Sequence, residues 1–554
     1  MLKVQDNKKT LIKQWENLSS AKALVFTVHC DQLVSYYEDD NTITVFYGFL
    51  DQDYQGKSAA EYVSNKIKQS GADGLNHCYG SFIVIHFDHE AKKFMLANDA
   101  LGDFALHYVT EGNVVNISDL PQALLTAKNS TINQERILHF FAVSKPQNNC
   151  CFYEQITQLN PGQFLTIDEN MTDIKQYYFP PINVNYKSQS VEKLAEQFKS
   201  LMQSVIDYQT KGQDRIGVMM SGGMDSTFIA ANGQKSGKNI HTFSYVFPTM
   251  PQANETIWLD AFRNKGFEMN TFTGESHWPL KYPWPVSLNA PVSNPYRHLK
   301  SVIYKNAENK KIQYLLSGVF ADHLYTGYIY WMVDLFKRKP LLAIKSFYSI
   351  SKQHGFKTGL RQIAPAKWSA KLKFKAPWLN KEANEQFQQS IKSLQPHKHP
   401  HPQQFALTYG LTTAQSVWLD HEYSFQHNLF VRHPFRDRRI VEFLMAIPAW
   451  VLGDYNLPKK FVRESSKDLL PDAIIRRTKT STLEPLFVKG VLDKELEKVK
   501  GVLYDQSSQW HHYIDKKIVD DLLKNPQKNH KDLNYVVLWQ CINFELWQKR
   551  LKNL

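Results

Sequence analysis

Ser221-Gly222-Gly223-Met224-Asp225-Ser226 is the stretch that says most about how this chain folds. Apolar residues precede it at 216–220 and follow it at 227–231, which predicts a buried strand, a tight turn and the start of a helix. Glycines let a backbone approach an anion closely, and the N–H groups at a helix N-terminus point toward it. The stretch therefore predicts a cradle for the phosphates of a nucleotide, and Asp225 is suited to bind the accompanying Mg²⁺.

Composition limits the classes of protein to consider. The 554 residues exceed what one hydrophobic core usually supports, so we expect two domains. No apolar run reaches the roughly 18 residues of a membrane-spanning helix. Residues 1–15 are polar and lysine-rich, unlike a secretory signal, so we expect a cytoplasmic protein with no integral membrane segment. The net charge of +13 accompanies no nucleic-acid-binding motif, and we therefore expect no nucleic acid as a partner.

Two kinds of pattern divide the chain. Residues 1–185 contain short alternating runs typical of β-strands, and the pair Pro180-Pro181 lies close to their end. Residues 186–554 begin with a helical pattern and then alternate strands with helices. We expect three of these strands at 216–220, 240–247 and 312–317. Such alternation predicts a doubly wound parallel sheet of the α/β class, with ligands at the carboxyl ends of its strands, and the region beyond residue 330 is predicted to be mostly helical.

Three further segments resemble the asparagine synthetase superfamily. They are LSGVFADHLYTG at 316–327, similar to the SGxGAD segment; RHPFRDRRIVEF at 432–443, similar to PFLDRRLVEF; and the run 459–480, similar to the KxxLRE, LP and RxKT tail. They occur in the family's order, so the resemblance extends over nearly the whole chain. It implies that ATP adenylates a carboxylate, with loss of pyrophosphate, and that an amine then forms an amide.

The resemblance also implies roles for individual residues. Asp225 and Asp322 match the metal-binding carboxylates of the family, and Lys459 and Lys479 match its catalytic lysines near the triphosphate and the developing oxyanion. The residues predicted to bind the nucleotide are Ser221, Gly222, Gly223, Asp225, Ser226, Val218, Met220, Ser244, Ser317 and Gly318. Asp322 is alternatively a salt-bridge or capping residue. The charged side chains of 432–438 are equally suited to holding the fold.

The N-terminal part resembles the glutaminase domain of the same superfamily. The matching segments are GSF at 80–82, NDALG at 98–102 and LNPG at 159–162. Position 2 is Leu2 where that domain needs a cysteine nucleophile, and Asn98 stands where the family carries arginine. Without a thiolate, nothing attacks the glutamine amide. We expect residues 1–185 to form an inactive class II glutaminase-like αββα sandwich, and residues 186–554 an ATP-pyrophosphatase-type synthetase domain with a helical C-terminal part.

Val319 narrows the expected substrate, because asparagine synthetases carry glutamate and beta-lactam synthetases tyrosine at the corresponding position. Residues 330–338, YWMVDLFKR, and the run 479–487 resemble segments of lasso-peptide macrolactam synthetases. This resemblance implies that an Asp or Glu side chain of a precursor core peptide is adenylated and joined to the peptide's N-terminal amine. It also implies a leader peptidase and a leader-recognition protein as partners.

Two other hypotheses stay open. The first is an ammonia-dependent asparagine synthetase or another amide ligase for a small acid; Val319 and the segment 330–338 argue against it. The second is a non-catalytic scaffold of a biosynthetic complex, which the presence of Asp225, Asp322 and Lys479 disfavours.

Overall fold

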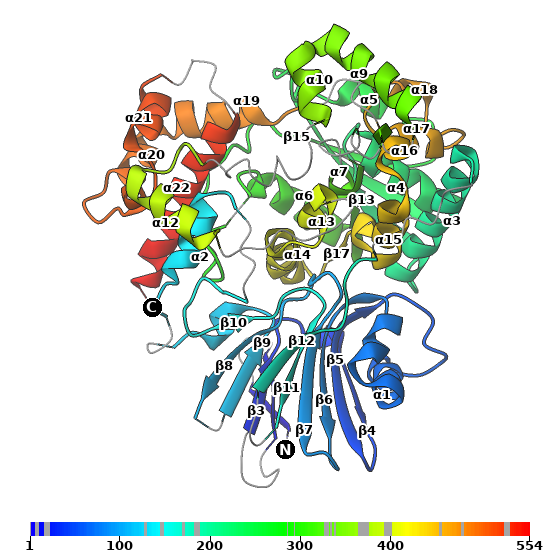
Figure 1. Ribbon diagram of the computed structural model, residues 1–554, viewed down its shortest axis with the longest axis vertical. Helices are drawn as coiled ribbons and strands as arrows, with labels where there is room; N and C mark the ends of the chain where they lie inside the picture. The colour runs from blue at the N-terminus through cyan, green and yellow to red at the C-terminus, as the bar shows by residue number, and fades with distance from the viewer. Residues whose placement is uncertain are drawn as a thin grey trace.

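A computed structural model represents the fold of the protein. It describes residues 2–5, 10–15, 23–112, 114–126, 130–144, 149–168, 172–181, 189–284, 286–292, 294–325, 332, 335–336, 339–363, 376–392, 402–453, 457–477, 481–525 and 532–553. A β-rich N-terminal part lies below a larger α/β part, and the C-terminal helices form a group beside the latter (Figure 1). The predicted boundary between residues 185 and 186 lies outside the described residues.

The N-terminal part contains two six-stranded sheets. Their strands are β1 (Leu2–Gln5), β2 (Thr10–Trp15), β3 (Ala23–Thr27), β4 (Val34–Glu38), β5 (Thr42–Leu50), β6 (Gly80–Asp88), β7 (Lys93–Asn98), β8 (His107–Glu111), β9 (Val114–Ser118), β10 (Thr157–Gln158), β11 (Gln163–Ile167) and β12 (Thr172–Gln176). The strand orders are β1-β2-β3-β9-β8-β10 and β12-β11-β7-β6-β5-β4.

Alternation along β5 explains how these sheets stack. Val45 and Tyr47 belong to the core between the two sheets, whereas Phe46 belongs to the cluster on the other face, where α1 (Ala59–Ser70) packs. Successive side chains of a strand point to opposite faces, so one strand supplies both layers. On the far side, Val109 of β8 shares a cluster with α2 (Gln134–Phe141). The predicted αββα sandwich is confirmed.

The larger part is built on a five-stranded parallel sheet in the order β15-β14-β13-β16-β17. The strands are β13 (Arg215–Met219), β14 (Asn239–Val246), β15 (Glu268–Thr273), β16 (Tyr314–Ser317) and β17 (Phe430–Arg432). Helices α3 (Val191–Gln209) and α4 (Met224–Lys235) pack on one face, and α6 (Arg297–Asn309) packs on the other. The strand order reverses between β13 and β16, which is where ligands bind in such sheets. The predicted doubly wound sheet is confirmed.

The helical C-terminal part is confirmed as well. The remaining described helices are α5 (Thr256–Asp260), α7 (Ala321–Tyr325), α9 (Pro340–His354), α10 (Phe356–Ile363), α12 (Lys381–Ser390), α13 (Pro402–Thr408), α14 (Leu411–Ser424), α15 (Arg438–Ala446), α16 (Ala449–Leu452), α17 (Lys460–Ser465), α18 (Asp472–Ile475), α19 (Glu484–Phe487), α20 (Leu496–Leu503), α21 (Lys516–Lys524) and α22 (Asp532–Leu551). Within the described ranges, none of the helices combines the length and the apolar character needed to cross a membrane.

Buried arginines join the two parts directly after β17. Arg436 donates hydrogen bonds from Nε to Asp103 Oδ1 at 2.6 Å and from Nη2 to the carbonyl of Leu101 at 2.9 Å. Arg432 pairs with the buried Asp51 carboxylate. The sequence left open whether the charges of 432–438 hold the fold or touch a substrate. In the structure these two arginines connect the synthetase sheet to the N-terminal sandwich.

Removing the Arg436 guanidinium is expected to destabilise the protein strongly. Arg436→Met leaves Asp103 buried without its cation, and breaking a buried ion pair costs about 3–5 kcal/mol. Denaturant unfolding followed by circular dichroism measures the change. The matched control is Arg263→Met, because Arg263 is 72% exposed and pairs with Asp260 at the surface; it should cost less than about 1 kcal/mol. Equal losses in both variants would contradict a joining role for Arg436.

Candidate active site

The segment predicted to cradle phosphates is the loop between β13 and the N-terminus of α4. The Ser226 hydroxyl accepts a hydrogen bond from the Ser221 amide at 3.1 Å and donates one to the Ser221 carbonyl at 3.0 Å, so it holds the loop from inside. A Cβ on Gly222 would lie 2.4 Å from Cβ of Trp258, which leaves room only for glycine. Gly223 is the N-cap of α4 and provides no side-chain cap. The first-turn amides of α4 are therefore available to an anion.

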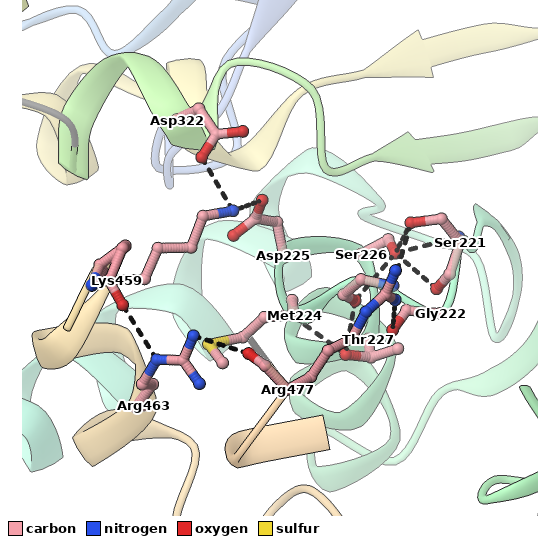
Figure 2. Close-up of polar contacts among 12 residues, drawn as sticks. Ser221, Gly222, Met224, Asp225, Ser226, Thr227, Asp322, Lys459, Arg463 and Arg477 are labelled. Carbon is pink, nitrogen blue, oxygen red and sulfur yellow. Dashed lines mark hydrogen bonds and ion pairs between the residues drawn. The ribbon is translucent and has the colours of Figure 1, made fainter. Parts of the chain in front are cut away.

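Three charged side chains meet beside this loop. Lys459 Nζ donates to Asp225 Oδ2 at 2.6 Å and to Asp322 Oδ1 at 2.8 Å (Figure 2). Asp225 lies in the first turn of α4, after β13, and Asp322 lies in α7, after the neighbouring strand β16. Lys459 stands just before α17 with a left-handed φ of 57°, a conformation that costs energy and is concentrated at functional sites.

Burial and charge set the protonation of this group. Burial raises the pKa of Asp225 to about 6; Lys459 opposes that shift, and Asp322 reinforces it. Burial disfavours the charged form of Lys459, but Asp225 and Asp322 outweigh it and raise the pKa of that ammonium above its usual value. The second carboxylate oxygen of Asp225, Oδ1, is buried without a hydrogen-bond partner among the described residues.

This donor set fits Mg²⁺ that arrives with a nucleotide. Mg²⁺ in proteins is usually held by one or two carboxylates, with phosphate oxygens and waters completing its coordination. Asp225 and Asp322 supply two carboxylates at one edge of the sheet, and Asp225 Oδ1 is an oxygen with no other partner in the described part. Neighbouring Ser221 and Gly223 are among the residues predicted to bind phosphate.

A cavity of about 430 Å³ opens beside the loop. Most of the predicted nucleotide-binding residues line it, namely Met220, Ser221, Gly223, Asp225, Ser226, Ser317 and Gly318. Its opposite wall is apolar or aromatic and includes Phe243, Tyr245, Leu299 and Ile303. The volume is within the roughly 300–1,000 Å³ of small-molecule sites. We call this space the nucleotide cavity, because its polar loop suits phosphates and its apolar wall suits a base.

Comparison with known proteins assigns the chain to a family. The profile described as asparagine synthase matches residues 197–549, which is more than half of the chain. The chain belongs to the asparagine synthase family. A second profile, described as a glutamine amidotransferase domain, matches residues 46–178.

Individual relatives are distant. Asparagine synthetase [glutamine-hydrolyzing] 1 of Bacillus subtilis (strain 168) is 22% identical over 487 residues, covering 81% of this chain and 74% of that protein. Asparagine synthetase [glutamine-hydrolyzing] 3 of the same organism is also 22% identical, over 507 residues. That match covers 83% of this chain and 76% of the relative. A solved structure, glutamine phosphoribosylpyrophosphate amidotransferase from B. subtilis, covers 52% of this chain and 73% of its own at 11% identity, with a TM-score of 0.19.

Membership of the asparagine synthase family confirms the expected class of enzyme, an ATP-dependent ligase that forms amide bonds. The roles of individual residues stay predictions. Val218 and Ser244 are buried and do not line the nucleotide cavity; Met219, Phe243 and Tyr245, their neighbours in sequence, line it instead. Lys479 lies outside the described residues.

Glu255 and Arg477, which contact Gly222 in the loop after β13, are two residues that were given no role from the sequence. Glu255 accepts a hydrogen bond from the Gly222 amide at 3.0 Å through Oε2. Arg477 donates to Glu255 Oε1 at 2.7 Å, and it also donates to the Gly222 carbonyl at 2.6 Å (Figure 2). Together they fix both backbone polar groups of Gly222. Arg477 belongs to the tail motif that carries Lys479, whereas nothing in the sequence around Glu255 distinguishes it.

Phe320 replaces a glycine in the SGxGAD motif, and its backbone keeps a conformation that usually requires glycine. It stands at the second glycine of the SGxGAD pattern and keeps a positive φ of 78°. For a bulky side chain this conformation is a genuine outlier. The ring packs edge-on against His323 and His433, with centroids 5.5 and 5.0 Å apart. These contacts hold a strained residue two positions before Asp322.

The raised pKa of Asp225 predicts a pH-dependent stability. Because the folded-state pKa of about 6 lies above the usual 3.8, protonated Asp225 favours folding; this contribution is complete below pH 3.8 and is lost as the pH rises through about 6. Asparagine cannot ionise, so it avoids the cost of the buried charge that Asp225 carries at high pH. Asp225→Asn should therefore raise the unfolding temperature more at pH 8 than at pH 5. Thermal unfolding at both pH values tests this, with the 79%-exposed Asp472→Asn as control. An equal effect of Asp225→Asn at both values would refute it.

Backbone strain at Phe320 can be separated from its ring contacts with two variants. Phe320→Ala and Phe320→Gly both lose the ring, but only glycine adopts a positive φ without steric cost. We expect Phe320→Gly to be the more stable of the two by about 1 kcal/mol, the reverse of the usual order. Denaturant unfolding of both variants measures the difference, and a more stable alanine variant would show that this φ stores no strain.

Proposed function

We propose that this enzyme is an ATP-dependent macrolactam synthetase that joins an Asp or Glu side chain of a precursor peptide to the peptide's own N-terminal amine. The observation that carries the proposal is Val319, which lines the nucleotide cavity beside Gly318 and is 50% exposed. A small amino acid such as aspartate presents an ammonium that needs an acidic partner when it is bound. Val319 provides none, and its apolar surface suits a larger, less charged substrate.

The proposed reaction has two steps. An oxygen of the peptide carboxylate attacks the α-phosphorus of ATP, and pyrophosphate leaves. The N-terminal amine then attacks the activated carbonyl, loses a proton, and AMP departs with the former carboxylate oxygen. ATP supplies the leaving group when bound, and Mg²⁺ neutralises phosphate charge.

The chain's own groups meet the needs of these steps. The first-turn N–H groups of α4 can donate hydrogen bonds to phosphate oxygens, and the Lys459 ammonium lies next to the carboxylates that would hold the metal. Fixed positive charge stabilises the negative charge that develops during phosphoryl and acyl transfer. Lys479 is the second lysine predicted for that role. Partners would be the precursor core peptide, a leader peptidase and a leader-recognition protein in the cytoplasm.

A second candidate is an asparagine synthetase or another amide ligase for a small acid. The observation that favours it is the similarity to the two Bacillus subtilis relatives, which are named as asparagine synthetases that hydrolyse glutamine.

The proposal is tested with purified protein, ATP, Mg²⁺ and the leader-free peptide encoded beside the gene. We expect the intact peptide mass to fall by one water while AMP forms. Asp225→Ala should abolish both products, because it removes a predicted metal ligand, whereas Asp472→Ala, at an exposed carboxylate, should retain them.

Parallel reactions with aspartate and either ammonia or glutamine separate the alternatives. An unchanged peptide together with asparagine formation would replace the proposal by the second candidate. An unchanged peptide, no asparagine and no binding of ATP and Mg²⁺ would indicate a scaffold.

A further inference from the structure

A second and larger cavity, of about 670 Å³, adjoins the nucleotide cavity. Its walls come from α2, α14, α19 and α22 together with Pro291, Val292, Pro295 and Tyr296. Most of the lining is apolar, and its aromatic side chains include Phe140, Phe152, Phe487, Tyr535 and Trp539. Thr482 lines both cavities, so the two spaces meet at this residue. We call the larger space the aromatic cavity.

One cation faces this apolar space from α2. Arg136 is only 5% exposed and lines the aromatic cavity. Its Nη2 donates to Gln415 Oε1 at 3.0 Å, and its guanidinium carbon lies 4.4 Å from the ring centre of Phe152. No carboxylate of the described residues pairs with it, in contrast to the buried Arg432 and Arg436. Burial lowers the pKa of the Arg136 guanidinium, which reflects the cost of keeping this charge away from water.

A buried cation without an anion is costly, and the cost is removed when a ligand supplies the anion. Arginine binds carboxylates with two parallel hydrogen bonds, and a desolvated apolar setting strengthens them. The aromatic face of Phe152 also holds the guanidinium plane in place by a cation–π contact. Arg136 therefore has the features of an anchor for a carboxylate.

An acidic residue, on α19 rather than α2, also lines the aromatic cavity. Glu484 lines the aromatic cavity next to Thr482, and its amide donates to the Thr482 hydroxyl at 3.2 Å. A carboxylate bound near Glu484 would be repelled, whereas an ammonium would be attracted. The negative end of the aromatic cavity thus lies at the nucleotide cavity, and a positive group lies on α2.

We propose that the aromatic cavity binds an apolar peptide segment whose carboxylate pairs with Arg136. This inference rests on the proposed function, because the bound segment would be part of the precursor peptide whose carboxylate is activated in the nucleotide cavity. The volume lies within the roughly 300–1,000 Å³ that accommodates multi-group ligands, so aspartate alone would leave most of it empty. The charge pattern orients the segment with its amine toward Glu484, close to where the amide forms.

Binding of simple peptides tests this without any turnover. Calorimetric titration compares acetyl-Leu-Leu-Phe with a free C-terminal carboxylate and the same peptide as its C-terminal amide. We expect the wild-type enzyme to bind the acid at least about tenfold more tightly, the effect of one charge-assisted contact. Arg136→Met should remove this preference while still binding the amide, and Arg263→Met, at the surface, should keep it. Acetyl-Leu-Glu-Phe amide shows whether a side-chain carboxylate serves as well as a terminal one.

Equal binding of acid and amide by the wild-type enzyme would overturn the proposal, and this comparison does not depend on any variant folding correctly. A preference that survives in Arg136→Met would overturn the assignment to Arg136. The macrolactam reaction is measured separately by peptide mass. If the enzyme binds the acid more tightly than the amide but does not cyclise the peptide, the proposed function is contradicted and the carboxylate site is supported. If it cyclises the peptide but binds acid and amide equally, the carboxylate site is contradicted and the proposed function is supported.

Discussion

The buried guanidinium of Arg436 determines how the two parts of this protein meet. It lies just beyond β17, the edge strand of the parallel sheet, and bonds to Asp103, the carbonyl of Leu101 and the carbonyl of Thr408. Because a guanidinium has its donors in a fixed plane, these acceptors can be satisfied in only one relative placement of the two parts. The N-terminal sandwich thereby becomes a fixed support for the synthetase sheet rather than a loosely tethered domain.

This support extends to the second cavity. Helix α2 belongs to the N-terminal part of the chain, yet it packs against α22, with the rings of Phe141 and Phe544 5.0 Å apart. The Trp378 indole adds a hydrogen bond to the carbonyl of Phe141 at 2.7 Å. Arg136 therefore faces a space whose other walls come from the far end of the chain. A glutaminase-like domain can contribute to substrate binding in this way, whether or not it hydrolyses glutamine.

Local sequence predicted the parallel sheet and the strand–turn–helix unit around Asp225, because such units follow short-range rules. The pairing of Asp225 with Asp322 came from the resemblance to the asparagine synthetase superfamily. Local sequence did not resolve which side chains of two strands face the nucleotide cavity. Val218 and Ser244 lie in strands covered on both faces, where an apolar run shows no alternation to reveal which side meets a ligand. Glu255 and Arg136 could not be found either, since their surroundings are set by segments 33 and 279 residues away. Such contacts follow from the tertiary fold alone.

The bridge from Lys459 to Asp225 and Asp322 has a consequence for the order of ligand binding. A covalently attached ammonium is a counterion that cannot diffuse away, and its effective concentration at the two carboxylates is far above that of any free ion. A lone divalent cation must displace it and leave the ammonium without an anion. A cation that arrives complexed with a polyphosphate brings a new anion for the displaced lysine. A metal ion complexed with a polyphosphate would therefore bind at this bridge more readily than a free metal ion.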